Sequence, residues 1–212
     1  MSSFMGKTTE QKIIEVATEL FAKNGYEGAS TREICEKVGA NISLISYYFG
    51  GKDGLYRKVV DNIVKNILTY MQAGFAENQN LKDFSNLSKD EKVKLFFMIL
   101  ERMTDYFYSD KMSDSIIMIL FREQITSGVP LNAYGYNIFK RLLASILDKG
   151  ENDREVIFRI VTFIGQIHSA RILKQFSLKM MDKMQYSDED AAHFKSIVIG
   201  QVKAIFKDLG VI

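Results

Sequence analysis

The sequence predicts an all-α protein of about nine helices, and three observations support this. The 212 residues include a single proline, Pro130, whereas Leu, Ile, Lys, Glu and Met, which favour helices, are abundant. Apolar residues recur three and four positions apart over long stretches, the spacing of one face of a helix. Hydrophobic residues make up 47% of the chain, which is enough for a buried core and excludes a disordered polymer.

The first helix is expected over residues 8–24. Its apolar residues fall at helical spacing and Gly25 follows them, as is typical of a helix end. They are Ile13, Val16, Ala17, Leu20 and Phe21. We expect this helix to cover the two helices that follow it.

Two short helices joined by a tight turn are expected between residues 30 and 52. Ser30 or Thr31 is a natural N-cap for the first of these helices, and Ser30 followed by Glu33 has the pattern of a capping box. Ile34 and Val38 lie four residues apart and can share one buried face. Gly39 then permits the positive φ that a helix end or a sharp turn requires.

The second short helix is expected to begin at Asn41 or Ser43 and to end at Phe49. Ile42, Ile45 and Phe49 fall at i, i+3 and i+7 and should face the interior, so Ser43, Leu44, Ser46 and Tyr47 should face outward. A hydroxyl-rich helix braced on another across a glycine turn is how a helix-turn-helix presents side chains to a DNA major groove. The same local pattern also occurs at ordinary corners of α-helical domains.

A long amphipathic helix should follow Gly50 and Gly51, from Lys52 to about Ala76, and link two parts of the molecule. A polar loop is expected over residues 77–92. Further helices are predicted over residues 88–107, 115–126, 131–147, 153–176 and 187–209.

An ordered set of residues runs through the first quarter of the chain. It comprises QKI at 11–13, ATELF at 17–21, GY at 25–26, ST at 30–31, Ile34, VG at 38–39, Ile45, YYF at 47–49 and KDGLY at 52–56. In this order and spacing the segment resembles the TetR family of bacterial transcriptional repressors. The resemblance implies a helix-turn-helix DNA-binding domain over residues 1–54, an effector-binding and dimerisation domain over residues 55–212, and a homodimer that binds double-stranded operator DNA.

The resemblance assigns DNA-contacting roles to eight residues. They are Thr31 and Arg32 at the start of the first short helix, Asn41, Ser43, Leu44 and Ser46 at base-facing positions of the second, Tyr47 against the sugar–phosphate backbone, and Lys52 on a phosphate. Arg32 could bond a guanine at two positions. The chain carries Ser46 where many members have tyrosine and Tyr48 where many have histidine, so its groove contacts should differ in detail.

Charge supports DNA binding only weakly. The formal net charge is +2, and residues 1–60 contain eight cationic and seven anionic side chains. A DNA-binding domain this close to neutral must place its few cations where phosphates pass. Its remaining phosphate contacts must come from backbone N–H groups and helix N-termini.

Residues 96–163 are rich in Phe, Met and Tyr. Most of these side chains must form core, yet methionine packs adaptably and suits a pocket for varied apolar molecules. The resemblance implies a pocket for a small hydrophobic effector in this region. Its candidate lining residues are Phe97, Met98, Phe107, Met118, Phe121, Arg122, Tyr134, Tyr136, Phe139 and Phe163. Arg122 could pair an acidic ligand group, and an ordinary surface position is the alternative.

The predicted helices over residues 153–176 and 187–209 have wide apolar faces. Such faces can pack inward or pair with those of a second copy. In relatives these helices form the dimer, so the resemblance implies the same here. The candidate interface residues are Phe163, Ile164, Ile167, Phe194, Ile197, Val198, Val202 and Ile205.

No catalytic, cofactor or metal site is expected, because GxSxG, HExxH, CxxC and glycine-rich phosphate motifs do not occur in the sequence. The lone Cys35 fits a reducing compartment, the N-terminus lacks the apolar stretch of a signal peptide, and no apolar run is long enough to span a bilayer. We therefore expect a cytoplasmic repressor that is not an enzyme. The alternative is an all-helical small-molecule-binding protein without DNA activity.

Overall fold

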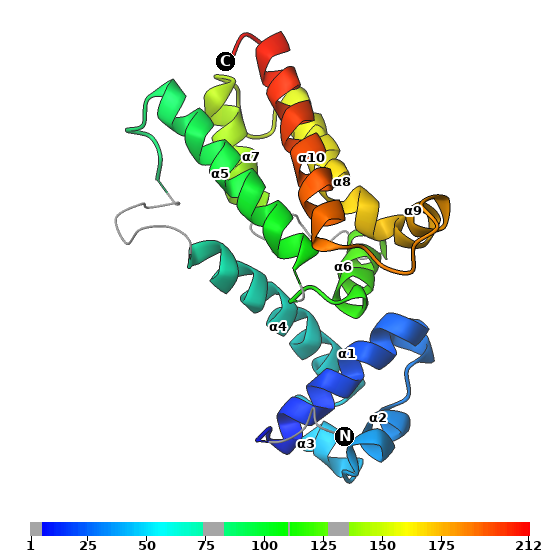
Figure 1. Ribbon diagram of the computed structural model, residues 1–212. Coiled ribbons are helices and arrows are strands. Elements are labelled where there is room, and N and C mark those ends of the chain that lie inside the picture. The colour runs from blue at the N-terminus through cyan, green and yellow to red at the C-terminus, as the bar shows by residue number, and fades with distance from the viewer. Residues whose placement is uncertain (1–5, 74–82, 110, 127–135) are drawn as a thin grey trace. The chain divides into compact units, whose positions relative to one another are not determined.

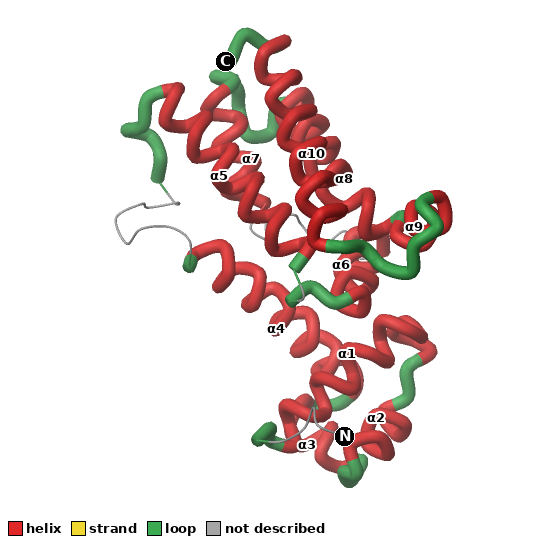
Figure 2. The backbone as a smooth tube through the Cα atoms, viewed as in Figure 1, coloured by secondary structure: helices red, strands yellow, loops and turns green. Residues whose placement is uncertain are grey.

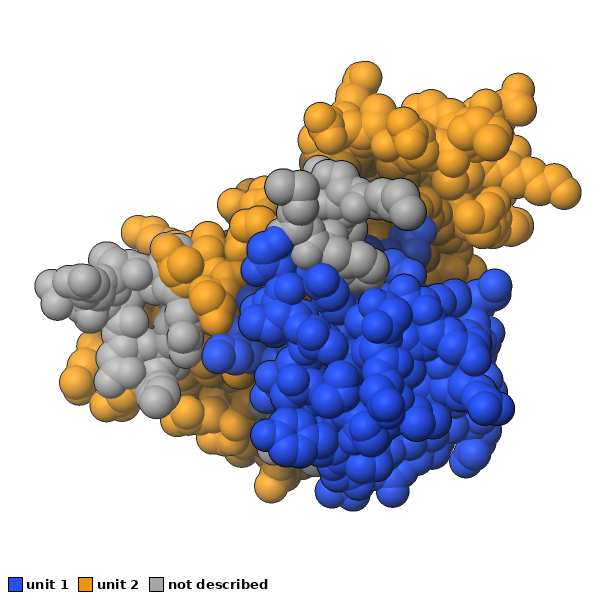
Figure 3. Space-filling view, turned by 90° about the horizontal axis from the view of Figure 1, so that it is seen from below, with its two compact units in different colours: residues 1–66, 113–130 blue, residues 67–112, 131–212 orange. Residues whose placement is uncertain are grey.

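The computed structural model describes residues 6–73, 83–109, 111–126 and 136–212. These residues form ten helices and no strand (Figures 1 and 2). The all-α prediction is therefore confirmed, with one helix more than expected. The chain divides into two compact units, coloured separately in Figure 3. Unit 1 holds residues 1–66 and 113–130, and unit 2 holds residues 67–112 and 131–212.

These units are not delimited by residue 54, where the family resemblance placed a domain boundary. Helix α4 (Lys52–Gln72) contributes its first part to unit 1 and its last part to unit 2. Helix α6 (Asp114–Thr126) lies in the C-terminal half of the sequence but belongs to unit 1, where it packs against α1 (Thr9–Gly28). Unit 1 is thus larger than a three-helix domain.

Helix α1 buries the apolar face that its spacing predicts: Ile13, Val16, Ala17, Leu20 and Phe21 are all buried. A capping box starts the helix, since Thr8 Oγ1 accepts from the N–H of Gln11 at 3.2 Å and Gln11 Oε1 accepts from the N–H of Thr8 at 2.9 Å. Regular helical geometry is interrupted at Gly25, which has φ 74°. The chain then reaches α2 (Thr31–Val38) and α3 (Ser43–Phe49), the two short helices of the predicted motif.

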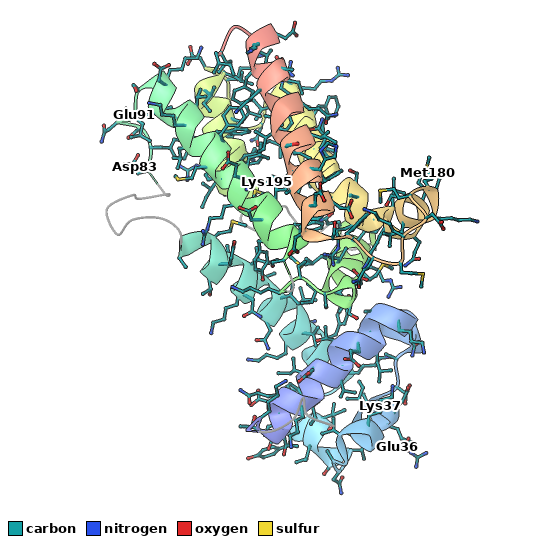
Figure 4. All side chains as sticks on the ribbon, viewed as in Figure 1. Glu36, Lys37, Asp83, Glu91, Met180 and Lys195 are labelled. Carbon is teal, nitrogen blue, oxygen red and sulfur yellow. The ribbon has the colours of Figure 1, made fainter. Side chains whose placement is uncertain are left out.

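Unit 2 is built from α5 (Lys89–Tyr108), α7 (Tyr136–Ile146), α8 (Arg154–Ile172), α9 (Lys174–Met180) and α10 (Asp188–Asp208). Its core is aromatic. The ring of Phe96 stacks on Phe139 with centroids 4.2 Å apart, and Phe206 lies 4.9 Å from Phe96. Ser88 and Glu91 form a capping box at the start of α5, where Figure 4 labels Glu91. Lys195 of α10 donates to Asp105 of α5 at 2.7 Å and so links these two helices at the surface.

The single helix predicted over residues 153–176 is wrong, because the chain bends by 61° between α8 and α9. Leu173 sits at the break with φ −94° and ψ 21°. Tyr186 explains how the break is stabilised: its hydroxyl donates to the carbonyl of Ala170 at 2.9 Å and so satisfies a carbonyl left open at the end of α8. Among the described residues no single helix is long and apolar enough for a membrane span, and α8 and α9 reach those values only when taken together.

The C-terminal end of α4 is bound to α5 within unit 2. Arg102 Nε donates to the carbonyls of Tyr70 at 3.0 Å and Met71 at 3.2 Å, and the guanidinium lies 4.3 Å from the centre of the Tyr70 ring. These carbonyls belong to the last turn of α4, where a cation is favoured by the helix dipole and by the lack of intrahelical donors. The end of α4 is therefore fixed by charge as well as by packing.

His168 is a buried histidine in the core of unit 2. It is 7% exposed, and its ring stacks on that of Phe107 with centroids 4.3 Å apart. Burial disfavours the charged imidazolium and lowers the pKa of His168 from 6.5 to about 4. The side chain is therefore neutral in the folded protein at pH 7, as expected for a core histidine.

This pKa predicts how stability depends on pH. Between pH 6.5 and 4 the unfolded chain binds more protons at His168 than the folded chain does, so the free energy of unfolding falls as the pH drops. We expect His168 to contribute a loss of about 2 kcal/mol between pH 7.5 and pH 5. Urea denaturation followed by circular dichroism at the two pH values measures it.

The matched variants are His168→Phe, which keeps an aromatic ring against Phe107 but does not titrate, and His193→Phe, at an exposed position on α10. The pH-dependent loss should shrink in the first variant and persist in the second. An unchanged loss in His168→Phe would contradict the assignment.

Candidate nucleic-acid interface

The turn between α2 and α3 has the geometry that the sequence predicts. Gly39 adopts the left-handed conformation, with φ 71° and ψ 35°, and its N–H donates to the carbonyl of Glu36 at 3.2 Å. The next N–H, of Ala40, donates to the carbonyl of Cys35 at 2.9 Å, so the end of α2 is closed by two backbone bonds. Ile34 and Ile45 are buried on either side of the turn and brace the two helices together.

Cys35 is buried beside this turn. Its thiol lies 3.8 Å from the carbonyl of Asn41, and burial raises the pKa of the thiol above its usual value. A protonated, buried thiol is a poor nucleophile and behaves as a small apolar group. Cys35 therefore contributes to packing beside the α2–α3 turn.

Helix α3 presents an exposed surface that carries most of its polar side chains. Ser43, Ser46 and Tyr47 are exposed, and Tyr47 reaches 80% exposure. Leu44, predicted to face outward with them, is half-buried. Three of the four base-facing side chains implied by the resemblance, Asn41, Ser43 and Ser46, are therefore accessible, and Leu44 is accessible only in part.

Ile42 is 52% exposed, so the prediction that it faces the interior is wrong. Ile45 and Phe49, which share its helical face, are buried and half-buried respectively. The helical period fixes the side on which a residue lies but not how far the core extends along the axis. Ile42 stands at the very start of α3, beyond the end of that core.

Asn41 and Ser43 are bonded to each other at this same end of the helix. Asn41 Oδ1 accepts from the N–H of Ser43 at 2.9 Å and from the hydroxyl of Ser43 at 2.8 Å. The first bond satisfies one of the open N–H groups at the start of α3. Asn41 makes this bond from the position before Ile42, which is the N-cap residue of α3.

Backbone contact fixes α3 against the first turn of α4. A Cβ atom placed on Gly54 would lie 1.7 Å from the carbonyl oxygen of Phe49. Only a glycine lets the last turn of α3 approach this closely, since both sides of the contact are main chain. The orientation of α3 therefore follows that of the start of α4.

Lys52, expected to bind a phosphate, is held against the end of α1. Its ammonium donates to the carbonyl of Glu27 at 3.2 Å and lies 4.6 Å from the centre of the Tyr26 ring. The hydroxyl of Tyr26 donates to the carboxylate of Asp53. An ammonium has three N–H donors, so the bond to Glu27 orients Lys52 and leaves it able to bind a phosphate.

Thr31 and Arg32 occupy the first turn of α2. Thr31 is half-buried, whereas the Arg32 side chain is 81% exposed and lies 3.9 Å from the carboxylate of Glu36. Figure 4 labels Glu36 and Lys37 on the same short helix. An exposed ion pair of this kind contributes about 0–1 kcal/mol, so Arg32 can exchange it for a contact with DNA.

Helix α6 packs against α1 within unit 1. Arg122 Nη1 donates to the carbonyl of Phe21 at 2.9 Å, and a Cβ atom on Gly25 would lie 3.1 Å from the same nitrogen. The next residue, Glu123, is buried and accepts from the hydroxyl of Tyr56. Arg122, predicted to line a ligand pocket, thus binds the end of α1, and the pair ties α6 to both α1 and α4.

The other predicted pocket residues are divided between the units. Unit 2 contains Phe107, Phe139 and Phe163, which are buried, Phe97, which is half-buried, and Met98, which is exposed. Unit 1 contains two of them on α6: Met118, which is exposed, and Phe121, which is half-buried. Tyr134 is outside the described residues, and Tyr136 begins α7 with its side chain not described. Phe139 and Phe163 both lie against Phe96, so they form core.

The predicted dimer residues face mostly inward. Phe163, Ile164, Ile167, Val198 and Val202 are buried within the single chain, Phe194 and Ile205 are half-buried, and Ile197 is exposed. The buried side chains form the intramolecular face of α8 and α10. A different set on α8 is exposed: Ile157, Phe158 and Val161.

Two protein families match the chain in succession. The family described as "Bacterial regulatory proteins, tetR family" matches residues 13–59, which include α2, the turn, α3 and the start of α4. The family described as "HTH-type transcriptional dual regulator CecR, C-terminal domain" matches residues 94–208, more than half of the chain. The chain belongs to the TetR family. It is therefore a transcriptional regulator with a DNA-binding helix-turn-helix, as the sequence resemblance implies.

Two relatives of this TetR-family regulator match along nearly their whole length. The chain is 25% identical to a Bacillus subtilis protein named "Probable HTH-type transcriptional regulator YttP", covering 94% of this chain and 92% of that one. It is also 25% identical to the dual regulator CecR of Shigella flexneri, covering 96% and 94%. A TetR-like transcriptional regulator from Rhodococcus sp. RHA1 has the same fold, with a TM-score of 0.61 at 15% identity over 92% of this chain and 96% of that one.

Two positions at the ends of α3 differ from what spacing alone predicts. A glycine in the first turn of a helix, such as Gly54, is a signal of close backbone approach. The spacing of Ile42 matches that of Ile45, which is buried, although Ile42 is exposed. No pattern in the sequence marks where the core ends along α3.

The contact at Gly54 predicts the effect of adding one methyl group. Gly54→Ala should destabilise unit 1 by at least about 2 kcal/mol, because the new Cβ atom meets the carbonyl of Phe49 and neither backbone can move without shifting α3. Thermal and urea denaturation measure the loss. Lys58→Ala, at an exposed position of the same helix, is the control and should change stability by less than about 0.5 kcal/mol. Equal effects from the two variants would refute the contact.

Proposed function

We propose that this TetR-family regulator is a homodimeric repressor, and not an enzyme, that binds a roughly palindromic operator and leaves it when a small hydrophobic effector binds. The observation that carries the proposal is the accessible surface of α3, held on α4 by the Gly54 contact. Two such helices related by a two-fold axis would enter successive major grooves, which lie about 34 Å apart along the duplex.

Tyr47 supports the DNA-binding part of the proposal. It is 80% exposed, and its ring lies 5.1 Å from that of Tyr48, so a broad aromatic surface faces away from the core of unit 1. Exposed aromatic rings add no packing stability to the isolated chain. On DNA they can pack on the sugar–phosphate backbone while Lys52 and Arg32 contact phosphates or bases.

We predict that Tyr47→Ala weakens operator binding by at least about tenfold, because it removes a large packing surface without touching the core. Electrophoretic shifts with the DNA upstream of the protein's own gene, at several salt concentrations, measure the effect. Phe176→Ala, at a 64% exposed aromatic on α9, is the matched control and should bind normally. A Tyr47→Ala protein that shifts the operator as well as the wild type would argue against the proposed surface.

The dimer is supported by the exposed face of α8 and by its neighbour α10. Phe158 and Val161 are 57% and 53% exposed in the single chain, and Ile197 on α10 is 42% exposed. A row of large apolar side chains open to water is costly for a single chain and typical of a subunit interface.

Two exposed glycines lie within these same helices, Gly165 on α8 and Gly200 on α10. A Cβ atom on either would meet nothing within 4 Å. A glycine inside a helix costs about 1 kcal/mol relative to alanine, and the single chain offers no packing reason for either. Close approach of a helix from a second copy supplies one. We therefore propose that α8 and α10 pair with their copies through this face.

We predict that Val161→Glu converts the dimer to monomers at micromolar concentration, since the carboxylate would be buried without a partner. Sedimentation equilibrium measures the change. Ile212→Glu, at a 50% exposed terminal position, is the control and should leave the dimer intact. A strictly monomeric wild type, or a dimeric Val161→Glu protein, would rule out this interface.

Effector release is supported by the anchoring of α4. Its first turn is fixed to α3 by Gly54, and its last turn is fixed to α5 by Arg102. An effector that binds among the helices of residues 88–176 and moves α4 would therefore move α3. A hundredfold preference for the form that cannot bind DNA corresponds to about 2.7 kcal/mol. Mass spectrometry of the purified protein would identify a retained effector.

A further inference from the structure

The start of α3 carries an apolar side chain that the proposed function leaves without a role. Ile42 is 52% exposed and stands between the exposed polar residues Asn41 and Ser43. In a helix-turn-helix, the residues at the N-terminal end of the second helix are those that reach the base edges. Ile42 is therefore at a reading position, although the hydrophobic spacing of α3 placed it in the core.

The polar neighbours of Ile42 have fewer hydrogen-bonding groups available to bases than their side chains would suggest. Reading an adenine at two points requires the oxygen of an asparagine to accept from N6 and its nitrogen to donate to N7. Asn41 Oδ1 already accepts two hydrogen bonds from Ser43, one for each of its lone pairs. Asn41 cannot read adenine in this way without giving up its two hydrogen bonds to Ser43 at the start of α3.

Ser43 is restricted by the same pair of bonds. Its hydroxyl hydrogen is donated to Asn41, so towards DNA the oxygen can only accept. The polar groups at this end of α3 therefore offer few donors to the acceptor-rich edges of guanine and adenine. What α3 presents there in full is the branched hydrocarbon side chain of Ile42.

The major groove contains one apolar group that a side chain of this kind can recognise, the 5-methyl of thymine. Contact between the two excludes water from both and is lost when the base is cytosine, which has no methyl. We infer that Ile42 is a specificity-determining residue, which packs on the 5-methyl group of one thymine in each operator half-site. This inference rests on the proposed binding of operator DNA.

The test combines a change in the protein with the removal of a single methyl group from the DNA. The operator is first located by footprinting on the DNA upstream of the gene, and each thymine in a half-site is then replaced by deoxyuridine, which removes only the methyl. We expect the wild type to lose about fourfold in affinity at one thymine per half-site, the value for one buried methyl.

Ile42→Ala supplies the second arm of the cycle. It should bind the natural operator about fourfold or more weakly, and it should lose nothing further when that thymine becomes deoxyuridine. Ile42→Val, which keeps a branched apolar side chain, should retain most of the sensitivity to the methyl. Ile125→Ala is the matched control at a 67% exposed isoleucine on α6, and it should behave as the wild type.

The outcomes separate this inference from the function on which it rests. Wild-type protein that binds the operator but is indifferent to every thymine methyl would overturn the role of Ile42 alone. So would an Ile42→Ala protein that keeps the full sensitivity to deoxyuridine, because Ile42 would then contact sugar, phosphate or another protein. Wild-type protein that binds no upstream DNA would overturn the proposed function and this inference together.

Discussion

The approach of the Phe49 carbonyl to Gly54 determines what α3 can do. Side chains can rotate away from a crowded contact, but this one joins two stretches of main chain and has no such freedom. The last turn of one helix and the first turn of the next therefore behave as one body. Lys52 and Asp53 reinforce that body through the carbonyl of Glu27 and the hydroxyl of Tyr26. The exposed side chains of α3 thus take their direction from α4.

A second connection within unit 1 runs through α6, which the sequence order alone would assign to the effector half. Arg122 supplies a cation to the C-terminal end of the regular part of α1, where carbonyls lack intrahelical donors. The carboxylate of Glu123 accepts a hydrogen bond from the hydroxyl of Tyr56, and the Tyr56 ring packs edge-on against Phe21. A segment far along the chain is in this way a structural part of the DNA-binding unit. Motion of α6 would be felt by both α1 and α4.

Local signals in the sequence were sufficient for the fold class, the helix-turn-helix and the family. Helical periodicity and Gly39 each depend on neighbours a few residues away, and the structure confirms them. The capping box predicted at Ser30 and Glu33 is wrong, because Ser30 precedes α2 without a side-chain hydrogen bond to it. Helix α8 shows where such reasoning stops. It is apolar on two faces: Phe163 and Ile167 are buried in the chain, whereas Phe158 and Val161 are exposed. Periodicity predicts that both faces are apolar, but which of them covers the core depends on helices far away in the sequence.

The same limit explains the other differences. The bend at Leu173 depends on a hydrogen bond from Tyr186, and the place of Arg122 depends on space beside Gly25. Ile42 keeps the spacing of a core residue but lies past the end of the core. These are tertiary contacts, and their partners are separated from them by up to about a hundred residues.

The thiol of Cys35 is a chemical probe for opening of the helix-turn-helix. It is 3% exposed beside the α2–α3 turn, and the sequence contains no other cysteine. An alkylating reagent can therefore reach sulfur only when that turn opens, and the rate of labelling reports how often it does. Operator DNA and effector can each be added to the same reaction. A slower labelling rate of Cys35 then shows that the added molecule keeps the α2–α3 turn closed.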